Sequence, residues 1–211
     1  MTNSKIISAG QDTARPAPKK ILDACCGGRM FWWNKNNPDT WFVDCRKVPK
    51  GAFQNNWNPN WCIEPDEIVD FRNMPYQSNG FNLVVFDPPH LTSGSMKSVI
   101  NKKYGLLNKQ TWKQDIVAGF KECWRVLAVG GVLIFKWNEA NIKAKELLRE
   151  FETEPLFGDF TGKTGATIWV TFLKTEESPV LSKRSPAQSA KEVYHTASNR
   201  RLAMLKIFFT F

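Results

Sequence analysis

The chain has 211 residues, of which 42% are hydrophobic, so it is long and apolar enough for a single domain with one core. It holds no apolar run of about 18 residues, which excludes a transmembrane helix, and its first 20 residues lack the apolar centre of a signal peptide. The net charge is +9, but residues 1–20 and 175–211 carry +6 of it. We therefore expect a cytoplasmic protein with a weakly basic centre and no membrane contact.

Segments in the first half of the chain alternate between apolar runs and turn residues. In chain order they are a strand over 19–26 (KKILDACC), a helix that begins in 29–36 (RMFWWNKN), a strand over 40–46 (TWFVDCR), an irregular lead-in over 65–69 and a strand over 81–86 (FNLVVF). A pair of glycines ends the first strand, and an Asn-Pro pair ends the helix. Two consecutive prolines follow the last strand, and neither has an N–H to donate to a sheet.

The second half begins with a loop over 91–113 that carries five lysines and no acid. The remaining elements are a helix over 111–127, a strand over 132–138, a charged helix over 139–151, and a hairpin of 155–160 and 167–174. Apolar residues at spacings of three and four identify the helix over 111–127 as amphipathic. Strands separated by helices predict an α/β fold with a mainly parallel sheet and helices on both faces. The hairpin would add an antiparallel strand at one edge.

Carboxylates mark the ends of the predicted parallel strands. Asp23, Asp44 and Asp87 end the first, second and fourth strands, and Asp70 follows the third. Lys136 and Asn138 lie toward the end of the fifth strand. Because ligands bind beyond the carboxyl ends of the strands in such sheets, these residues predict a polar site at that edge.

Two nucleotide-binding motifs are excluded. The first turn reads A-C-C-G-G-R and lacks the G-x-G-x-x-G spacing of dinucleotide-binding folds. Residues 158–164, GDFTGKT, are one residue short of a P-loop and lead into a strand rather than a helix.

The cysteines show no CxxC spacing and are odd in number, so we expect reduced thiols rather than disulfides. They are Cys25, Cys26, Cys45, Cys62 and Cys123. Zinc held by Cys45 and Cys62 would need further ligands in a chain that has two histidines, and we expect no metal site.

Three segments carry a resemblance to a known family. Residues 21–28, ILDACCGG, resemble the first-strand signature of class I S-adenosylmethionine-dependent methyltransferases, with an acidic residue and a glycine four positions later. Residues 69–85, VDFRNMPYQSNGFNLVV, resemble a second segment of that family. Residues 86–90, FDPPH, resemble the Asp-Pro-Pro-aromatic motif of amino-methyltransferases that act on adenine in DNA or RNA, and the chain is most similar to the small stand-alone kind encoded by phages and prophages.

The resemblance covers residues 19–174 and implies a Rossmann-like class I methyltransferase fold with a seven-stranded sheet. We expect a flexible N-terminal tail over 1–18, the methyltransferase domain over 19–174, and a basic polar linker with an apolar C-terminal tail over 175–211. Three positions depart from the family pattern. Arg29 and Cys25 stand where glycine is common, and His90 replaces a Tyr, Phe or Trp.

The DPPH residues have roles that follow from their chemistry. An exocyclic amine is a poor nucleophile because its lone pair is delocalised into the ring. The Asp87 carboxylate and the Pro88 carbonyl would each accept one amine hydrogen and turn the lone pair toward the methyl group. Pro88 and Pro89 fix the backbone, and His90 would pack against the flat ring. A base in a duplex must first flip out of the helix.

The other carboxylates would bind the cofactor, S-adenosyl-L-methionine. Asp44 would accept hydrogen bonds from the ribose hydroxyls, and Asp70 and the Phe71 amide would bind the adenine. The resemblance implies that Asp23 and the backbone of Ala24, Cys25, Cys26, Gly27 and Gly28 hold the methionine part. The structural alternative for Asp23 and Asp44 is a helix cap or a turn former. We expect Cys25 and Cys26 to be small residues near a tight turn rather than nucleophiles. We expect Trp32 and Trp33 in the core, and the alternative is that one of them borders the cofactor pocket.

The lysines of the loop over 91–113 favour a nucleic-acid partner, DNA more than RNA, with Lys102 and Lys103 as substrate-binding residues. Lys136 is a further candidate, with exposure to solvent as its alternative. The sequence leaves the oligomeric state open. Three hypotheses follow: a methyltransferase acting on the adenine amine, a small-molecule or protein methyltransferase on the same fold, and a non-catalytic module that binds the cofactor and nucleic acid.

Overall fold

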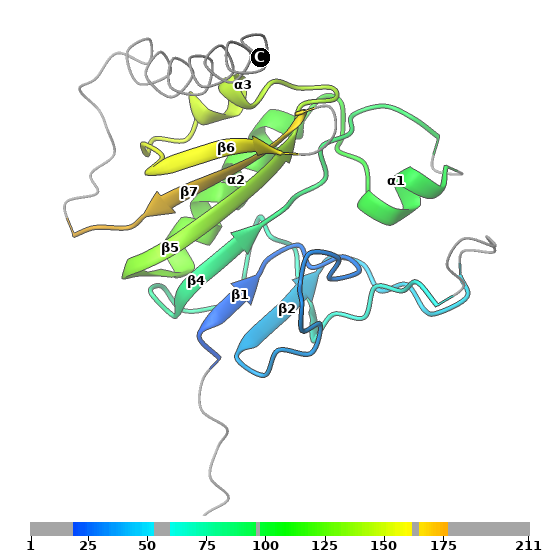
Figure 1. Cartoon of the computed structure of the whole chain (residues 1–211), viewed down its shortest axis with the longest axis horizontal. Coiled ribbons are helices and arrows are strands. Elements are labelled where there is room, and N and C mark those ends of the chain that lie inside the picture. The colour runs from blue at the N-terminus through cyan, green and yellow to red at the C-terminus, as the bar shows by residue number, and fades with distance from the viewer. Residues whose placement is uncertain (1–18, 53–59, 96–97, 162–164, 177–211) are drawn as a thin grey trace, which may run out of the picture.

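The computed structural model describes residues 19–52, 60–95, 98–161 and 165–176. Seven strands form one sheet in the order β3-β2-β1-β4-β5-β7-β6. The strands are β1 (Ile21–Asp23), β2 (Thr40–Asp44), β3 (Glu67–Ile68), β4 (Phe81–Phe86), β5 (Leu127–Asn138), β6 (Phe157–Thr161) and β7 (Thr167–Leu173). The first five run parallel, and β7 pairs antiparallel with β5 and β6 (Figure 1). This arrangement confirms the predicted class I methyltransferase fold, with its antiparallel hairpin at one edge.

The described residues contain three helices, α1 (Val99–Tyr104), α2 (Trp112–Val126) and α3 (Ala144–Leu148). Thr111 begins α2, and its hydroxyl donates to Asp115 at 2.7 Å. The helix packs Ile116, Phe120 and Cys123 against the sheet. The predicted helix over 111–127 is thus confirmed to within one residue at each end. The predicted helix over 139–151 shortens to the five residues of α3.

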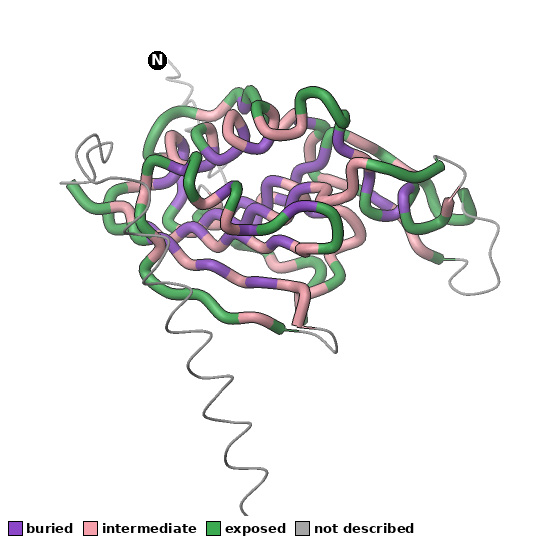
Figure 2. The backbone as a smooth tube through the Cα atoms, turned by 90° about the horizontal axis from the view of Figure 1, so that it is seen from above, coloured by how far each residue is buried: buried purple, intermediate pink, exposed green. Residues whose placement is uncertain are grey.

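The core lies between α2 and the face of the sheet that α2 covers. Phe120 of α2 and Phe151 stack with ring centroids 3.9 Å apart, and Phe172 of β7 meets Phe120 edge to face. Phe135 of β5 packs against Phe86 of β4 and Phe151. Figure 2 shows the buried positions gathered in the central strands and the exposed positions along the outer loops. Among the described residues, no helix is long and apolar enough to cross a membrane.

The helix predicted to begin in residues 29–36 is wrong, because the segment between β1 and β2 folds into turns. The side chains of Asn34 and Asn37 accept hydrogen bonds from backbone N–H groups two residues later, at 3.0 and 2.9 Å. Such local bonds compete with a helix. The turns pack on the sheet face opposite α2, where Phe31 meets Trp169 and Trp32 meets Phe42 edge to face. Trp33, predicted as core, is fully exposed.

The predicted loop over 91–113 contains α1, which lies apart from the sheet, past the end of β4 (Figure 1). The predicted lead-in over 65–69 forms the two-residue strand β3. The predicted tails over 1–18 and 175–211 lie outside the described residues, apart from residues 175 and 176.

Candidate active site

A cavity of about 270 Å³ opens where the carboxyl ends of β1, β2 and β4 meet, a volume near the lower end of ligand pockets. Its floor is the turn over residues 24–28, and Asp44 and Asp87 stand on its walls. Lys103 and Tyr104 of α1 and Lys136 of β5 also line the cavity. The structure therefore brings together most of the predicted site residues at the predicted edge of the sheet.

Hydrogen bonds that continue those of the sheet fix the backbone of the turn after β1. The Ala24 N–H donates to the Val85 carbonyl at 2.9 Å, and the Cys26 N–H donates to the Val43 carbonyl at 2.8 Å. Gly27 has φ +48°, in the left-handed region, and nothing lies within 4 Å of the position where a Cβ would be. This glycine therefore gives the turn a conformation that other residues rarely adopt and leaves its surface open to a ligand.

Asp23 is fully buried beneath this turn and does not line the cavity. Its carboxylate accepts hydrogen bonds from the Trp32 indole at 2.7 Å and from the Cys25 N–H at 3.3 Å. Burial raises the pKa of Asp23 to about 7, with the negative charges of Asp87 and Asp44 adding to the effect. Trp32, predicted as core, therefore has a second role as the hydrogen-bond donor that holds Asp23.

The Asp44 carboxylate is saturated by hydrogen bonds. Oδ1 accepts from the backbone N–H and Nε of Arg46 at 2.9 and 3.0 Å. Oδ2 accepts from Nη2 of Arg46 at 3.2 Å and from the Gly27 N–H at 3.0 Å. Since a carboxylate offers about four acceptor positions, ribose hydroxyls can reach Asp44 only by displacing Arg46. Arg46 also donates through Nη1 to the Lys102 carbonyl of α1 at 3.2 Å.

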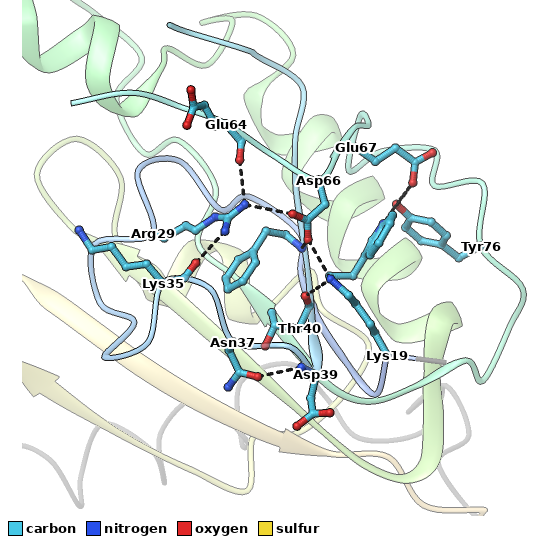
Figure 3. A network of polar contacts seen from close by, with 12 residues as sticks. Lys19, Arg29, Lys35, Asn37, Asp39, Thr40, Glu64, Asp66, Glu67 and Tyr76 are labelled. Atoms are coloured by element: carbon cyan, nitrogen blue, oxygen red, sulfur yellow. Dashed lines mark hydrogen bonds and ion pairs between the residues drawn. The ribbon is translucent and has the colours of Figure 1, made fainter. Parts of the chain in front are cut away.

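Arg29 explains how the turn tolerates a residue where glycine is common. Its φ is +53°, the left-handed conformation that glycine adopts without strain. The guanidinium donates to the carbonyls of Lys35 and Glu64 at 2.7 and 2.8 Å and pairs with Asp66 at 3.2 Å (Figure 3). It also lies 3.9 Å from the centroid of the Phe42 ring. These contacts fasten the turn to the chain segment before β3.

Asp87 and Lys136 form an ion pair, with 2.6 Å between Oδ2 and Nζ. Burial raises the pKa of Asp87, and the Lys136 ammonium opposes that rise. Pro88 is buried, and Pro89 lines the cavity. Lys136 is thus a cavity residue that contacts the predicted catalytic carboxylate, rather than a lysine that points into solvent.

His90 lies between two aromatic rings, with centroid distances of 6.0 Å to Tyr104 and 6.2 Å to Trp137. Burial lowers the pKa of His90 to about 4, and the nearby Lys136 charge adds to the effect. The imidazole is therefore neutral at physiological pH. A neutral flat ring can stack on a base as the usual aromatic residue does.

Not every predicted residue faces the cavity. Asp70 accepts hydrogen bonds from Arg72, the shortest at 2.6 Å, and does not line the cavity, whereas Phe71 does. Lys102 is exposed on α1 and does not line the cavity, whereas Lys103 is mostly buried and does. Lys113 pairs with Glu150 at 3.1 Å on the outer surface. Lys97 lies outside the described residues.

The cysteines near the site are poor nucleophiles. Burial raises the pKa of Cys25 and that of Cys26 well above the usual range, so neither ionises near neutral pH. All five cysteines are free thiols in the structure. Within the described ranges, no group of three or more His, Cys, Asp or Glu side chains could hold a metal ion.

Several residues that line the cavity were not predicted from the sequence, chiefly Arg46, Trp61 and Tyr104. A signal for Arg46 existed, because an arginine two residues after a strand-end aspartate can fold back onto it. Trp61 and Tyr104 carried no such signal, since both come from segments between strands whose course is set by tertiary packing.

No protein-family model and no curated protein matches the chain. Among solved structures, it is similar to the PH0226 protein of Pyrococcus horikoshii, with a TM-score of 0.50 and 12% identity over 74% of this chain and 82% of that one. It is similar at a TM-score of 0.46 to the N-methyltransferase NodS of Bradyrhizobium japonicum, with 16% identity over 75% and 86% of the two chains. A putative DNA modification methylase of Thermus thermophilus, solved with S-adenosyl-L-methionine, follows at a TM-score of 0.36 and 16% identity over 58% of each chain. At 12% identity the similarity to the PH0226 protein supports the fold alone, and the reaction must be argued from the site.

Proposed function

We propose that this protein is an S-adenosylmethionine-dependent methyltransferase that transfers the methyl group to the exocyclic amine of adenine, in DNA more than in RNA. The observation that carries the proposal is the position of Asp87, Pro88, Pro89 and His90. Asp87 and Pro89 line the cavity at the carboxyl ends of the strands, and Pro88 and His90 are their neighbours in the chain. In this fold that edge is where a nucleoside ligand binds.

The residues of the cavity fit the charge and shape of the cofactor. Asp44 and Asp87 offer carboxylates to the cationic groups and hydroxyls of the cofactor, while Arg46, Lys103 and Lys136 line the same cavity and would suit its carboxylate. The turn around Gly27 would hold the methionine part, Asp44 the ribose, and Phe71 the adenine. S-adenosyl-L-methionine supplies a methyl group that its sulfonium already activates.

The chain itself aligns the target amine. Asp87 Oδ1 and the Pro88 carbonyl would accept the two amine hydrogens, which localises the nitrogen lone pair for attack. The prolines hold that carbonyl in place, and His90 stacks on the base. The sulfonium would supply the methyl group and leave as a neutral thioether, and Asp87 would accept one proton from the methylated amine and pass it to solvent.

A nucleic-acid substrate is supported by the lysines beside the cavity. Lys102 and Lys109 are exposed within or just after α1, which adjoins the cavity through Lys103 and Tyr104. Exposed lysines near a base-binding site suit phosphates.

The test is methyl transfer from labelled S-adenosylmethionine to duplex DNA, single-stranded DNA and total RNA, followed by digestion to nucleosides and mass spectrometry. We expect label on adenine with the wild type and a loss of at least about a hundredfold with Asp87→Ala. A matched control is Asp159→Ala, an exposed carboxylate of β6. Cofactor binding without label on any nucleic acid would overturn the proposal. It would leave a small-molecule or protein substrate, or a non-catalytic role.

A further inference from the structure

We propose that Lys136 is a positioning residue that holds the Asp87 carboxylate in place for the target amine. The inference rests on the proposed function and goes beyond it. It replaces the prediction that Lys136 binds substrate directly with a role exerted through Asp87.

The register of the sheet places the two side chains together. Phe86 of β4 pairs with Phe135 of β5 in parallel, so the next residues, Asp87 and Lys136, stand side by side where β4 ends. Lys136 Nζ and Asp87 Oδ2 are 2.6 Å apart, and the two side chains are 23% and 18% exposed. Such a short, mostly buried pair has a defined geometry, unlike an ion pair between surface side chains.

Two aromatic rings hold the Lys136 ammonium in place. Lys136 Nζ lies 5.6 Å from the ring centroids of both Phe31 and Trp169. These two rings meet edge to face at 5.4 Å, and Trp169 is the direct β7 partner of Lys136. A cation near two aromatic faces is stabilised by both. The turn after β1 and the antiparallel hairpin thus both contribute to the orientation of Asp87.

The two oxygens of the Asp87 carboxylate have different roles in this arrangement. Oδ2 accepts from Lys136, and no described residue donates to Oδ1, which is left for the target amine. Burial favours the protonated carboxyl, which is a poorer acceptor. The Lys136 charge counters this effect and favours the ionised form of Asp87.

Other titratable groups also face this region. Asp23 and Cys25 lie on the β1 side and interact electrostatically with Asp87. His90 follows in the same loop, and Lys103 and Tyr104 of α1 line the same cavity. Of these, Asp23 has a pKa of about 7, so its titration has to be separated from that of Asp87 by assignment.

The experiment compares wild type with Lys136→Met and Lys136→Arg, using Lys121→Met as a matched control because Lys121 is an exposed lysine of α2. Carboxyl-carbon NMR, with the Asp87 signal assigned through Asp87→Asn, measures the Asp87 pKa without any need for turnover. Steady-state methyl transfer across pH then gives kcat and KM.

We expect Lys136→Met to raise the Asp87 pKa by at least about one unit. We also expect it to lower kcat at pH 7 by about tenfold or more, with partial recovery at higher pH. KM should change little, and Lys136→Arg should restore most of the loss. An unchanged Asp87 pKa, or a raised KM at constant kcat, would overturn the inference. A wild type that methylates no nucleic acid would refute the proposed function, while the NMR titration would still decide whether Lys136 controls Asp87.

Discussion

At the scale of single residues, Asp23 is a buried carboxylate whose ionisation a cationic ligand would favour. Its pKa of about 7 arises chiefly from burial, and two other carboxylates add to it. A cation in the adjoining cavity favours the ionised form. Near pH 7 the Asp23 carboxyl is protonated in about half of the molecules. A cationic cofactor that favours the ionised form therefore releases protons as it binds.

We therefore predict that the affinity for S-adenosylmethionine rises with pH between about 5.5 and 7 and then levels off, because above the Asp23 pKa no proton remains to be released. Calorimetry in buffers of different ionisation enthalpy would measure the protons released at pH 6.5. Asp23→Asn should abolish the release. A pH-independent affinity for the wild type would contradict this account of Asp23.

His90 gives a second prediction at this scale. If the neutral imidazole stacks on the base, His90→Phe should keep most of the activity. His90→Ala should lose about tenfold to a hundredfold in kcat/KM, as expected for the loss of one stacked ring. Because the pKa of His90 is about 4, the pH–rate profile should contain no histidine titration between pH 5 and 8. An inactive His90→Phe would show that an imidazole nitrogen, rather than the ring face, is required.

The positions of Asp44, Asp87 and Pro89 at the cavity were predictable from the sequence, because residues at the carboxyl ends of parallel strands lie at one edge of such a sheet. The partners of these residues were not predictable. Trp32 was expected in the core and instead holds Asp23, since nothing in its spacing reveals a hydrogen bond across nine residues.

At the scale of elements, Arg46 connects the cofactor site with α1. It occupies acceptor positions on Asp44 and donates to the Lys102 carbonyl. Cofactor binding that displaces Arg46 would also release α1, which carries lysines proposed to contact the substrate. The two binding events are therefore expected to influence one another.

We predict that Arg46→Ala tightens S-adenosylmethionine binding by about threefold to tenfold, because the ribose no longer competes with an internal donor. Amide hydrogen exchange in α1 should become faster. Calorimetry and hydrogen exchange measure these two effects. Arg72→Ala is the matched control, since Arg72 also follows its aspartate by two residues but lies outside the cavity. Weaker binding in Arg46→Ala would show that Arg46 holds the cofactor instead of excluding it.

Elements with a strong local signal were predicted well. The strand over 81–86 is an apolar run bounded by glycine and proline, and it appears with the expected bounds. The helix predicted to begin in 29–36 does not form. Asparagine side chains there accept hydrogen bonds from nearby backbone N–H groups, and Arg29 adopts a left-handed conformation. The six-residue helix α1 was missed because it is too short to show a period.

At the scale of the whole molecule, the order of the strands determines where the chemistry lies. Placing β1 between β2 and β4 brings three aspartates and the glycine turn to one edge. The succession of apolar strands predicted a mainly parallel sheet, although among the described residues only the connections after β4 and after β5 contain helices. Further walls of the cavity come from α1 and from the segment before β3, which Arg46 and Arg29 respectively contact through long-range hydrogen bonds.

The measurement that tests the account most directly is isothermal titration of S-adenosylmethionine into the wild type, Asp44→Ala and Asp159→Ala. We predict one binding site per chain for the wild type, affinity lowered at least about tenfold in Asp44→Ala, and no change in Asp159→Ala, whose carboxylate is exposed on β6. A wild-type chain that does not bind the cofactor, or that binds equally well after Asp44→Ala, would contradict the assignment of this cavity.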